Sequence, residues 1–262
     1  PIPSRGLGDV YKRQANISII TIDSEEGLEI MRHTLAAQVL ARAVKNLYPK
    51  SKLAIGPTIK DGFYYDVECK ETISIDDLKK IEKEMDKIVK TKSSITKKLL
   101  SKKDALKVFK DKDESYKEEI INDSDQEDKF QLYYQDDEDF VDLCKGPHLP
   151  NLNFIGAYKL TTISGAYWKG DSSNTMLTRI YGTAWSNEKD LNEHLNNIEE
   201  AQKRDHRKLG KEMDLFHFQE EAPGMVFWHP NGWSIYRNLR NFVRKRLQEN
   251  DYIEVNTPQV ID

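Results

Sequence analysis

Cysteine and long apolar runs are scarce in this chain. Its 262 residues include only Cys69 and Cys144, which are too few for a disulfide framework. No stretch approaches the roughly 20 apolar residues that span a bilayer, and the N-terminal residues lack the charged-then-apolar pattern of a signal peptide. We therefore predict a cytoplasmic protein without a membrane span, in which Cys144 is a free thiol.

The chain also lacks an excess of positive charge and a phosphate-binding loop. It carries 40 Lys and Arg against 44 Asp and Glu, a net charge of -4, so contact with nucleic acid would have to come from local patches. No Walker-type loop is present, and Gly6 and Gly8 lack the strand and helix context of a dinucleotide motif. The sequence therefore predicts no ATP-binding site in this chain.

Periodicity predicts a mixed N-terminal region. Residues 17–22 read as a short strand, and a helix is expected from 25 to 48. Along this helix His33, Ala37 and Leu40 recur with other aliphatic residues at spacings of three and four, which places His33 on the inward face.

Turn and capping signals continue the pattern. An Asp-Gly pair at 61–62 predicts a hairpin, and Ser74 with Asp77 predicts a capped helix. A shorter helix is expected after Ser101, and short β-rich runs follow from 131 to 181. The region from about 25 to 185 therefore reads as α+β.

The C-terminal part reads as a connection to a second body. Residues 187–213 predict one long exposed helix. Its basic end at 203–208 is open to two interpretations, a phosphate contact or a solvated helix face. A further helix leads into an expected strand at 252–255 that has no later partner strand. Since residues 1–14 show no regular period, we expect that the chain is cut at both ends.

The segment 142–148 holds the residues best suited to chemistry. Asp142, Cys144 and His148 lie within one short stretch, and His33 could reach them from its helix. His33, Cys144 and His148 are candidate protein ligands for a tetrahedral zinc ion whose fourth position stays open. The alternative is that His33 is a hydrogen-bonded core histidine.

The sequence alone leaves several roles open for Asp142 and Cys144. Asp142 could orient an imidazole or a water molecule, or cap a turn. Cys144 as a nucleophile would need a depressed pKa and a base in contact, so we favour positioning of water over covalent catalysis. Lys117 reads as an ordinary surface lysine.

The order of motifs closely resembles that of bacterial threonyl-tRNA synthetases. The resemblance covers about 15–262 and leaves 1–14 outside. It is carried by the His33 helix, Gly-Phe-Tyr-Tyr-Asp at 62–66, Glu-Ser-Tyr-Lys at 114–117, Asp-Leu-Cys-Lys-Gly-Pro-His at 142–148, Gly-Ala-Tyr-Trp at 165–168, Arg-Ile-Tyr-Gly-Thr-Ala-Trp at 179–185, Lys-Arg-Asp-His-Arg at 203–207 and Glu-Ala-Pro-Gly-Met-Val-Phe-Trp-His at 221–229.

The resemblance implies a domain order. It assigns 15–24 to the end of a small N-terminal (TGS-like) domain, 25–186 to an editing domain of the threonyl/alanyl-tRNA synthetase type, and 187–213 to a linker helix. Residues 214–262 would begin a class II catalytic domain built on an antiparallel sheet, with the motif 1 helix and strand that form the homodimer interface. ATP, magnesium and the zinc ion that recognises threonine would bind beyond this segment, which would therefore lack the aminoacylation site.

The resemblance also implies a reaction and its residues. One methyl group discriminates substrates only about 10- to 200-fold, so the family hydrolyses serine that is mischarged on tRNA(Thr). The corresponding catalytic positions are His33, Lys117, Asp142, Cys144 and His148, which would orient water and hold the ester near the terminal ribose. The expected tRNA-binding positions are Tyr64, Tyr65, Trp168, Arg204 and Arg207, although core packing is the alternative for the aromatic residues.

Ala37 departs from the family pattern. The family has a second histidine four residues after the first, on the same helical face, and Ala37 can neither bind a metal nor move a proton. Editing would then be slow, rerouted through Gln38 or water, or lost. The alternative function is an editing-defective segment that binds the tRNA acceptor end and dimerises.

Overall fold

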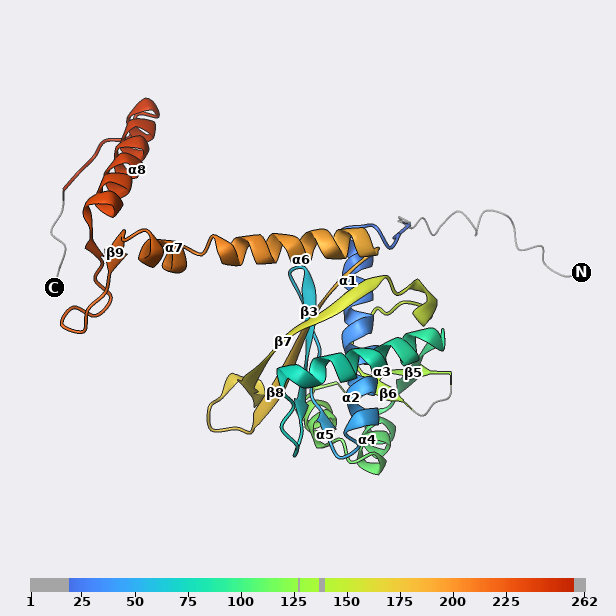
Figure 1. The fold of residues 1–262 in the computed structure, drawn as a ribbon. Coiled ribbons are helices and arrows are strands. Elements are labelled where there is room, and N and C mark those ends of the chain that lie inside the picture. Colours follow the sequence, from blue (N-terminus) through green and yellow to red (C-terminus); the bar gives the residue numbers. More distant parts are fainter. Residues whose placement is uncertain (1–18, 127, 137–139, 257–262) are drawn as a thin grey trace, which may run out of the picture. The chain divides into compact units, whose positions relative to one another are not determined.

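The computed structural model describes residues 19–126, 128–136 and 140–256. The chain divides into two compact units, Pro1–Asn192 and Glu193–Asp262, which are described separately (Figure 1). The first unit combines helices with antiparallel sheets, in agreement with the α+β prediction.

The first unit begins with one continuous helical rod. It consists of α1 (Glu25–Thr34), a π-helical stretch η2 (Leu35–Leu40) and α2 (Ala41–Leu47). Ser24 caps the rod because its side chain accepts a hydrogen bond from the Gly27 amide, 3.1 Å away. The predicted helix is confirmed, whereas nothing in the sequence indicated the π-helical stretch, whose six residues are all buried. The predicted strand at 17–22 is wrong for residues 19–22, which pair with no other strand; residues 17–18 lie outside the described residues.

A five-stranded antiparallel sheet supports this rod. Its order is β1-β3-β8-β7, and β2 also pairs with β3. The strands are β1 (Lys52–Leu53), β2 (Thr58–Ile59), β3 (Gly62–Glu68), β7 (Ala157–Tyr167) and β8 (Met176–Trp185). The predicted Asp-Gly hairpin forms between β2 and β3, where Ile59 pairs with Gly62 and Asp61 has a positive φ of 60°. Phe63, Tyr65 and Val67 are buried in the core cluster that also contains the rod.

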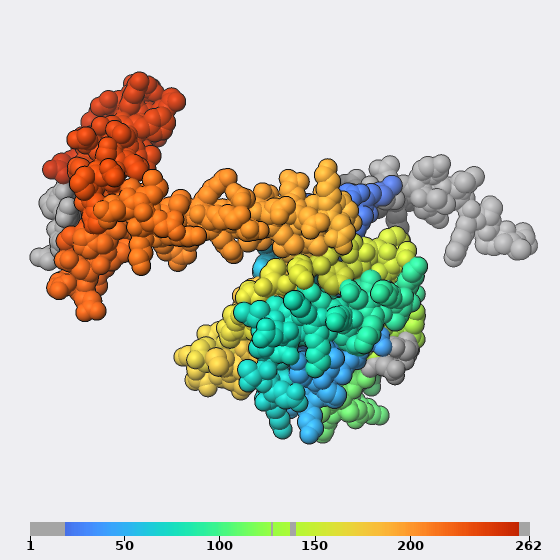
Figure 2. All heavy atoms as spheres, viewed as in Figure 1, coloured from blue at the N-terminus to red at the C-terminus, as the bar shows by residue number. Residues whose placement is uncertain are grey.

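Helix α3 (Leu78–Lys90) packs against α2 and β7. It follows the short η3 turn (Ile75–Asp77), where Ser74 and Asp77 form the predicted capping box. Glu82 accepts hydrogen bonds from the Leu160 amide and from Lys159 of β7. These contacts hold α3 beside β7 on the face of the unit that Figure 2 shows.

A three-stranded sheet lies in the other half of the unit. It consists of β4 (Ile95–Leu100), β5 (Phe130–Gln135) and β6 (Val141–Leu143), all antiparallel. Helices α4 (Lys102–Asp111) and α5 (Ser115–Asn122) supply Phe109 and Ile121 to a core that they share with β5 and β6. The predicted helix after Ser101 and the predicted β-rich region are confirmed. Short η4 (Leu152–Phe154) and η5 (Trp168–Gly170) turns precede and follow β7.

Two predictions for the C-terminal part of the chain are wrong. The single helix predicted over 187–213 is interrupted: α6 (Glu188–Lys203) ends and α7 (His206–Glu212) begins after Asp205, whose side chain accepts the Arg207 amide. Because the Asp205 side chain caps the start of α7, the chain leaves the helical conformation between α6 and α7. The strand predicted at 252–255 does not form, because no described strand pairs with these residues.

The remaining elements of the second unit are a hairpin and a helix. Strands β9 (Phe216–His217) and β10 (Phe227–Trp228) pair, and α8 (Pro230–Glu249) follows with Pro230 in its first turn. Several large apolar side chains of α8 are exposed, including Leu239 and Phe242. No helix within the described ranges is both long and apolar enough to cross a membrane.

Gly182 is required where β8 crosses the core. A Cβ atom at this position would lie 2.6 Å from the buried Phe63 ring. We predict that Gly182→Ala lowers the free energy of unfolding by about 1–3 kcal/mol through overpacking, measured by urea denaturation. Gly165→Ala on β7 is the matched control, since its Cβ would meet only the exposed Met176 side chain. Equal effects at the two positions would contradict this account.

Candidate functional site

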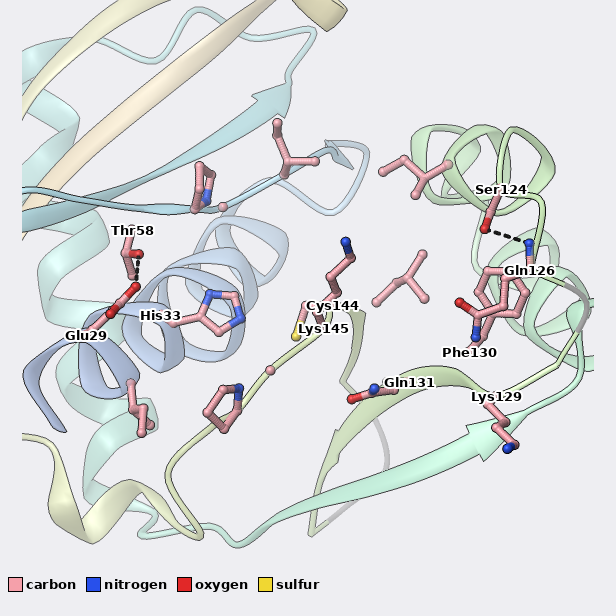
Figure 3. A pocket seen from close by; sticks show the side chains of 18 of the residues that line it. Glu29, His33, Thr58, Ser124, Gln126, Lys129, Phe130, Gln131, Cys144 and Lys145 are labelled. Carbon is pink, nitrogen blue, oxygen red and sulfur yellow. Dashed lines mark hydrogen bonds between the residues drawn. The ribbon is translucent and has the colours of Figure 1, made fainter. Parts of the chain in front are cut away.

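A pocket of about 700 Å³ opens in the first unit. Its walls come from α1, from residues 55–58, from residues 120–131 and from residues 143–147. Figure 3 shows His33 on the α1 side, Phe130 and Gln131 on the opposite side, and Cys144 with Lys145 between them.

Three of the predicted residues meet beside this pocket. The Sγ atom of Cys144 lies 2.8 Å from Nε2 of His148. The His33 and His148 rings stack with their centroids 4.6 Å apart and their planes 6° apart. The donor atoms of His33, Cys144 and His148 all lie within 4.8 Å of one another. The fold therefore brings His33 to Cys144 and His148, from which it is separated by more than 100 residues in the sequence.

Gly146 allows the segment 142–148 to lie close to strand β5. Its φ is +64°, and a Cβ atom there would lie 2.0 Å from the Tyr133 hydroxyl. Tyr133 in turn packs edge-on against His148, with a centroid distance of 4.5 Å. Only glycine permits both the left-handed backbone and this contact. Tyr133 was not anticipated as part of the site, because its place in the sequence indicates only a β-rich run.

A buried ion pair lies next to the cluster. Lys117 Nζ on α5 is 2.5 Å from Oδ1 of Asp142 on β6, and both side chains are almost fully buried. The Tyr65 hydroxyl donates to Asp142 Oδ2 at 3.0 Å, and the Leu143 amide donates to Oδ1 at 2.8 Å. The prediction of an ordinary surface lysine at 117 is wrong, since the residue is only 2% exposed. The alternative that Asp142 caps a turn is not supported, because Asp142 is buried on strand β6.

The electrostatics of the cluster favour neutral groups. Burial lowers the pKa of His148 to about 3, with a smaller effect from His33. Burial also lowers the pKa of His33, although Asp142 and a backbone hydrogen bond with Gly56 oppose the shift. The pKa of Cys144 is raised to about 12, mainly by burial and then by Asp142. Near pH 7 the imidazoles and the thiol are therefore uncharged, which opposes a nucleophilic thiolate at Cys144.

Ala37 and Gln38 are buried and contribute no wall to the pocket. Ala37 is 1% exposed and belongs to the apolar core of the π-helical stretch. Gln38 is fully buried and receives hydrogen bonds from Gln135 at its backbone and side-chain oxygens. Neither residue lines the pocket. The geometry therefore does not support rerouting of the reaction through Gln38.

The predicted tRNA-binding aromatic residues belong to the first unit. Tyr65 is 0% and Trp168 is 6% exposed, so a base cannot stack on either ring; Trp168 instead donates to Glu119. Tyr64 is half-buried beneath the Arg179 guanidinium, 3.9 Å from its ring centroid. The stacking prediction is therefore corrected for Tyr65 and Trp168, whose large apolar rings fill the interior.

The two predicted arginines belong to the second unit. Arg204 pairs with Glu200 at 3.3 Å, and Arg207 pairs with Asp205 at 2.6 Å. Both are exposed. Sequence patterns predicted no role for Lys129 and Lys145, two exposed cations that line the pocket of the first unit. The only signal for Lys145 was its position inside the 142–148 motif.

Comparison with known proteins shows which sequences this chain resembles. Residues 131–181 match the family described as the threonyl and alanyl tRNA synthetase second additional domain. The chain thus carries a domain of aminoacyl-tRNA synthetases. It is 52% identical over 248 residues, or 95% of its length, to the threonine--tRNA ligase of Prochlorococcus marinus (strain MIT 9211). The chain is a homologue of threonine--tRNA ligase, and it spans 38% of the length of this relative.

The buried ion pair gives a test of the site's architecture. We predict that Lys117→Met lowers the free energy of unfolding by about 3–5 kcal/mol, because it leaves the Asp142 carboxylate buried without a counter-charge. The double variant Lys117→Met with Asp142→Asn should recover part of this loss. Urea denaturation at pH 7 measures both.

Lys97→Met, at an exposed position on β4, is the control and should change stability by less than about 0.5 kcal/mol. A Lys117→Met variant as stable as this control would contradict the buried ion pair.

Proposed function

We propose that the first unit hydrolyses the ester of serine mischarged on tRNA(Thr), as part of a protein whose overall activity is threonine--tRNA ligation. The observation that carries the proposal is the convergence of His33, Lys117, Asp142, Cys144 and His148 beside one pocket, from three separate segments of a threonine--tRNA ligase homologue.

The proposed reaction uses water as the nucleophile. His33 lines the pocket and is neutral near pH 7, so it can accept a proton from water. The water oxygen bonds to the ester carbonyl carbon, the bond from that carbon to the ribose oxygen breaks, and the proton passes to the ribose oxygen. Lys117 and Asp142 remain paired and hold α5 and β6 together beside the cluster. Cys144 and His148 position water or the ester rather than bond to it.

The rim of the pocket offers complementary charges. Lys129 and Lys145 would contact phosphates of the tRNA acceptor end, since both are exposed cations at the pocket. Glu26 and Glu29 on α1 would face the ammonium group of the seryl moiety. Tyr64 remains a candidate for contact with a base at its exposed edge, and Arg204 and Arg207 for contact with phosphates.

We also propose that His33, Cys144 and His148 can hold zinc. Two imidazoles and a thiol are the ligands of a catalytic zinc ion with an open fourth position, and a bound ion would deprotonate the thiol despite its raised pKa. The 2.8 Å separation of Cys144 and His148 must widen, because ligands at about 2.0–2.3 Å from one ion lie farther apart. Bound zinc would polarise a water molecule or the ester carbonyl.

A broader assignment follows from the same homology. We propose domain boundaries at 15–24, 25–186, 187–213 and 214–262, with 1–14 outside them, and a cytoplasmic location. The helix α8 would belong to motif 1 of a class II synthetase and contribute to a homodimer through its exposed apolar residues. ATP, magnesium and a threonine-binding zinc would belong to parts of the ligase outside this chain.

Ala37 favours a second candidate, an editing-defective segment that binds the tRNA acceptor end and dimerises. Its methyl group cannot replace a catalytic imidazole, and its position is enclosed in the core. The next experiment separates the two functions.

The test is the rate at which the chain hydrolyses seryl-tRNA(Thr). We predict hydrolysis above a protein-free blank and a loss of about 10²- to 10⁴-fold in His33→Ala, because a positioned base is removed. Threonyl-tRNA(Thr) should react roughly 10- to 200-fold more slowly, since the extra methyl must fit the pocket. Cys69→Ser, at a cysteine outside the cluster, should leave the rate unchanged.

A parent chain no faster than the blank, beside an active Ala37→His variant, would contradict the hydrolase and support the editing-defective segment. Filter binding of the tRNA shows whether an inactive chain still binds its partner.

The metal proposal has a spectroscopic test. We predict that cobalt(II) added to the chain produces a thiolate-to-cobalt charge-transfer absorption that Cys144→Ser abolishes. Cys69→Ser is the matched control and should retain the band, because Cys69 lies outside the cluster. Absence of the band from the parent, or its survival in Cys144→Ser, would exclude this metal site.

A further inference from the structure

Thr34 is the last residue of α1 and follows His33 directly. Its side chain is fully buried, and its Oγ1 atom meets three polar groups. The Ile30 carbonyl oxygen lies 2.8 Å away, the Leu149 amide nitrogen 3.0 Å away, and Nδ1 of His148 3.1 Å away. One hydroxyl thus joins the helix to the segment that carries Cys144 and His148.

The Thr34 hydroxyl can donate and accept only a limited number of hydrogen bonds. A threonine hydroxyl has one hydrogen to donate and two lone pairs that accept. The hydrogen goes to the Ile30 carbonyl oxygen, and the Leu149 N–H occupies one lone pair. Only the second lone pair is left for His148. The contact at 3.1 Å is therefore a hydrogen bond when His148 carries its hydrogen on Nδ1.

The opposite edge of the ring is compatible with this tautomer. His148 Nε2 faces the sulfur of Cys144 at 2.8 Å. This sulfur also accepts the Gly146 N–H. Its S–H can then donate to Nε2 only if Nε2 carries a lone pair. In the other tautomer two hydrogens would point at each other between nitrogen and sulfur.

We propose that Thr34 is a positioning residue that holds His148 as the Nδ1–H tautomer, so that its Nε2 lone pair is always directed to Cys144. This lone pair is the one that an S–H donor or a metal ion would use. The effect on hydrolysis rests on the proposed function, whereas the tautomer does not. Since His148 stacks on His33, the same hydrogen bond fixes the ring behind the proposed base.

The experiment is NMR of the full chain labelled with ¹⁵N histidine, with chelator present and near pH 7. Long-range proton–nitrogen correlations identify the tautomer of each ring, and His148→Gln assigns the signal. We expect the Nδ1–H tautomer in the parent and in Thr34→Ser, which keeps the hydroxyl. Thr34→Val should shift the tautomer ratio by roughly 2- to 10-fold toward Nε2–H, which is the effect of one lost hydrogen bond.

Thr183→Val is the matched control, because Thr183 is a buried threonine whose hydrogen bonds involve Asp61 and Trp185. It should leave the His148 signal unchanged. A parent that carries the hydrogen on Nε2 would overturn the proposal, even where Thr34→Val does not fold. An unchanged tautomer ratio in a folded Thr34→Val, or in Thr34→Ala as its substitute, would also overturn it.

The hydrolysis rate separates the two proposals. A tautomer shift in Thr34→Val supports the positioning role whether or not the parent hydrolyses seryl-tRNA(Thr). If the parent is active, Thr34→Val should lower kcat and leave KM nearly unchanged, and Thr34→Ser should restore kcat. If Thr34→Val shifts the tautomer but hydrolyses the substrate at the rate of the parent, Thr34 has only a structural role. This result would contradict its part in the reaction.

Discussion

The buried ion pair between Lys117 and Asp142 is the interaction on which the first unit depends. Lys117 comes from α5 and Asp142 from β6 of the small sheet, and Tyr65 reaches the same carboxylate from β3 of the large sheet. Two charges taken out of water are costly, so they are tolerated only where each oxygen and each N–H finds a partner. The three residues therefore fix how the two sheets of this unit meet, and the pocket forms beside that junction.

The chemistry of the pocket follows from this arrangement. A paired Lys117 and Asp142 add little net charge, so burial is the largest cause of the pKa shifts of His33, His148 and Cys144. The result is a group of neutral donors and acceptors. Such a group is suited to orienting water, to holding an ester, or to binding a metal ion that supplies its own charge.

Local signals predicted much of the fold correctly. The helix at 25–48, the Asp-Gly hairpin and the Ser74 capping box all formed, because each depends on neighbouring residues. The strands expected at 19–22 and 252–255 did not form, since a strand needs a partner that local sequence cannot supply. The π-helical stretch and the break at Asp205 were also missed, as both interrupt patterns that are otherwise continuous.

The sequence by itself determined which reactive groups the chain carries, the spacing of Cys144 and His148, and the resemblance to threonyl-tRNA synthetases. Only the tertiary structure decided that Lys117 is buried, that Tyr65 holds a carboxylate rather than a base, and that Thr34 meets His148. The physical reason is distance along the chain. Burial and hydrogen-bond partners are set by segments that lie far apart in sequence, and the free energy of a buried polar group depends on those partners rather than on its neighbours in the chain.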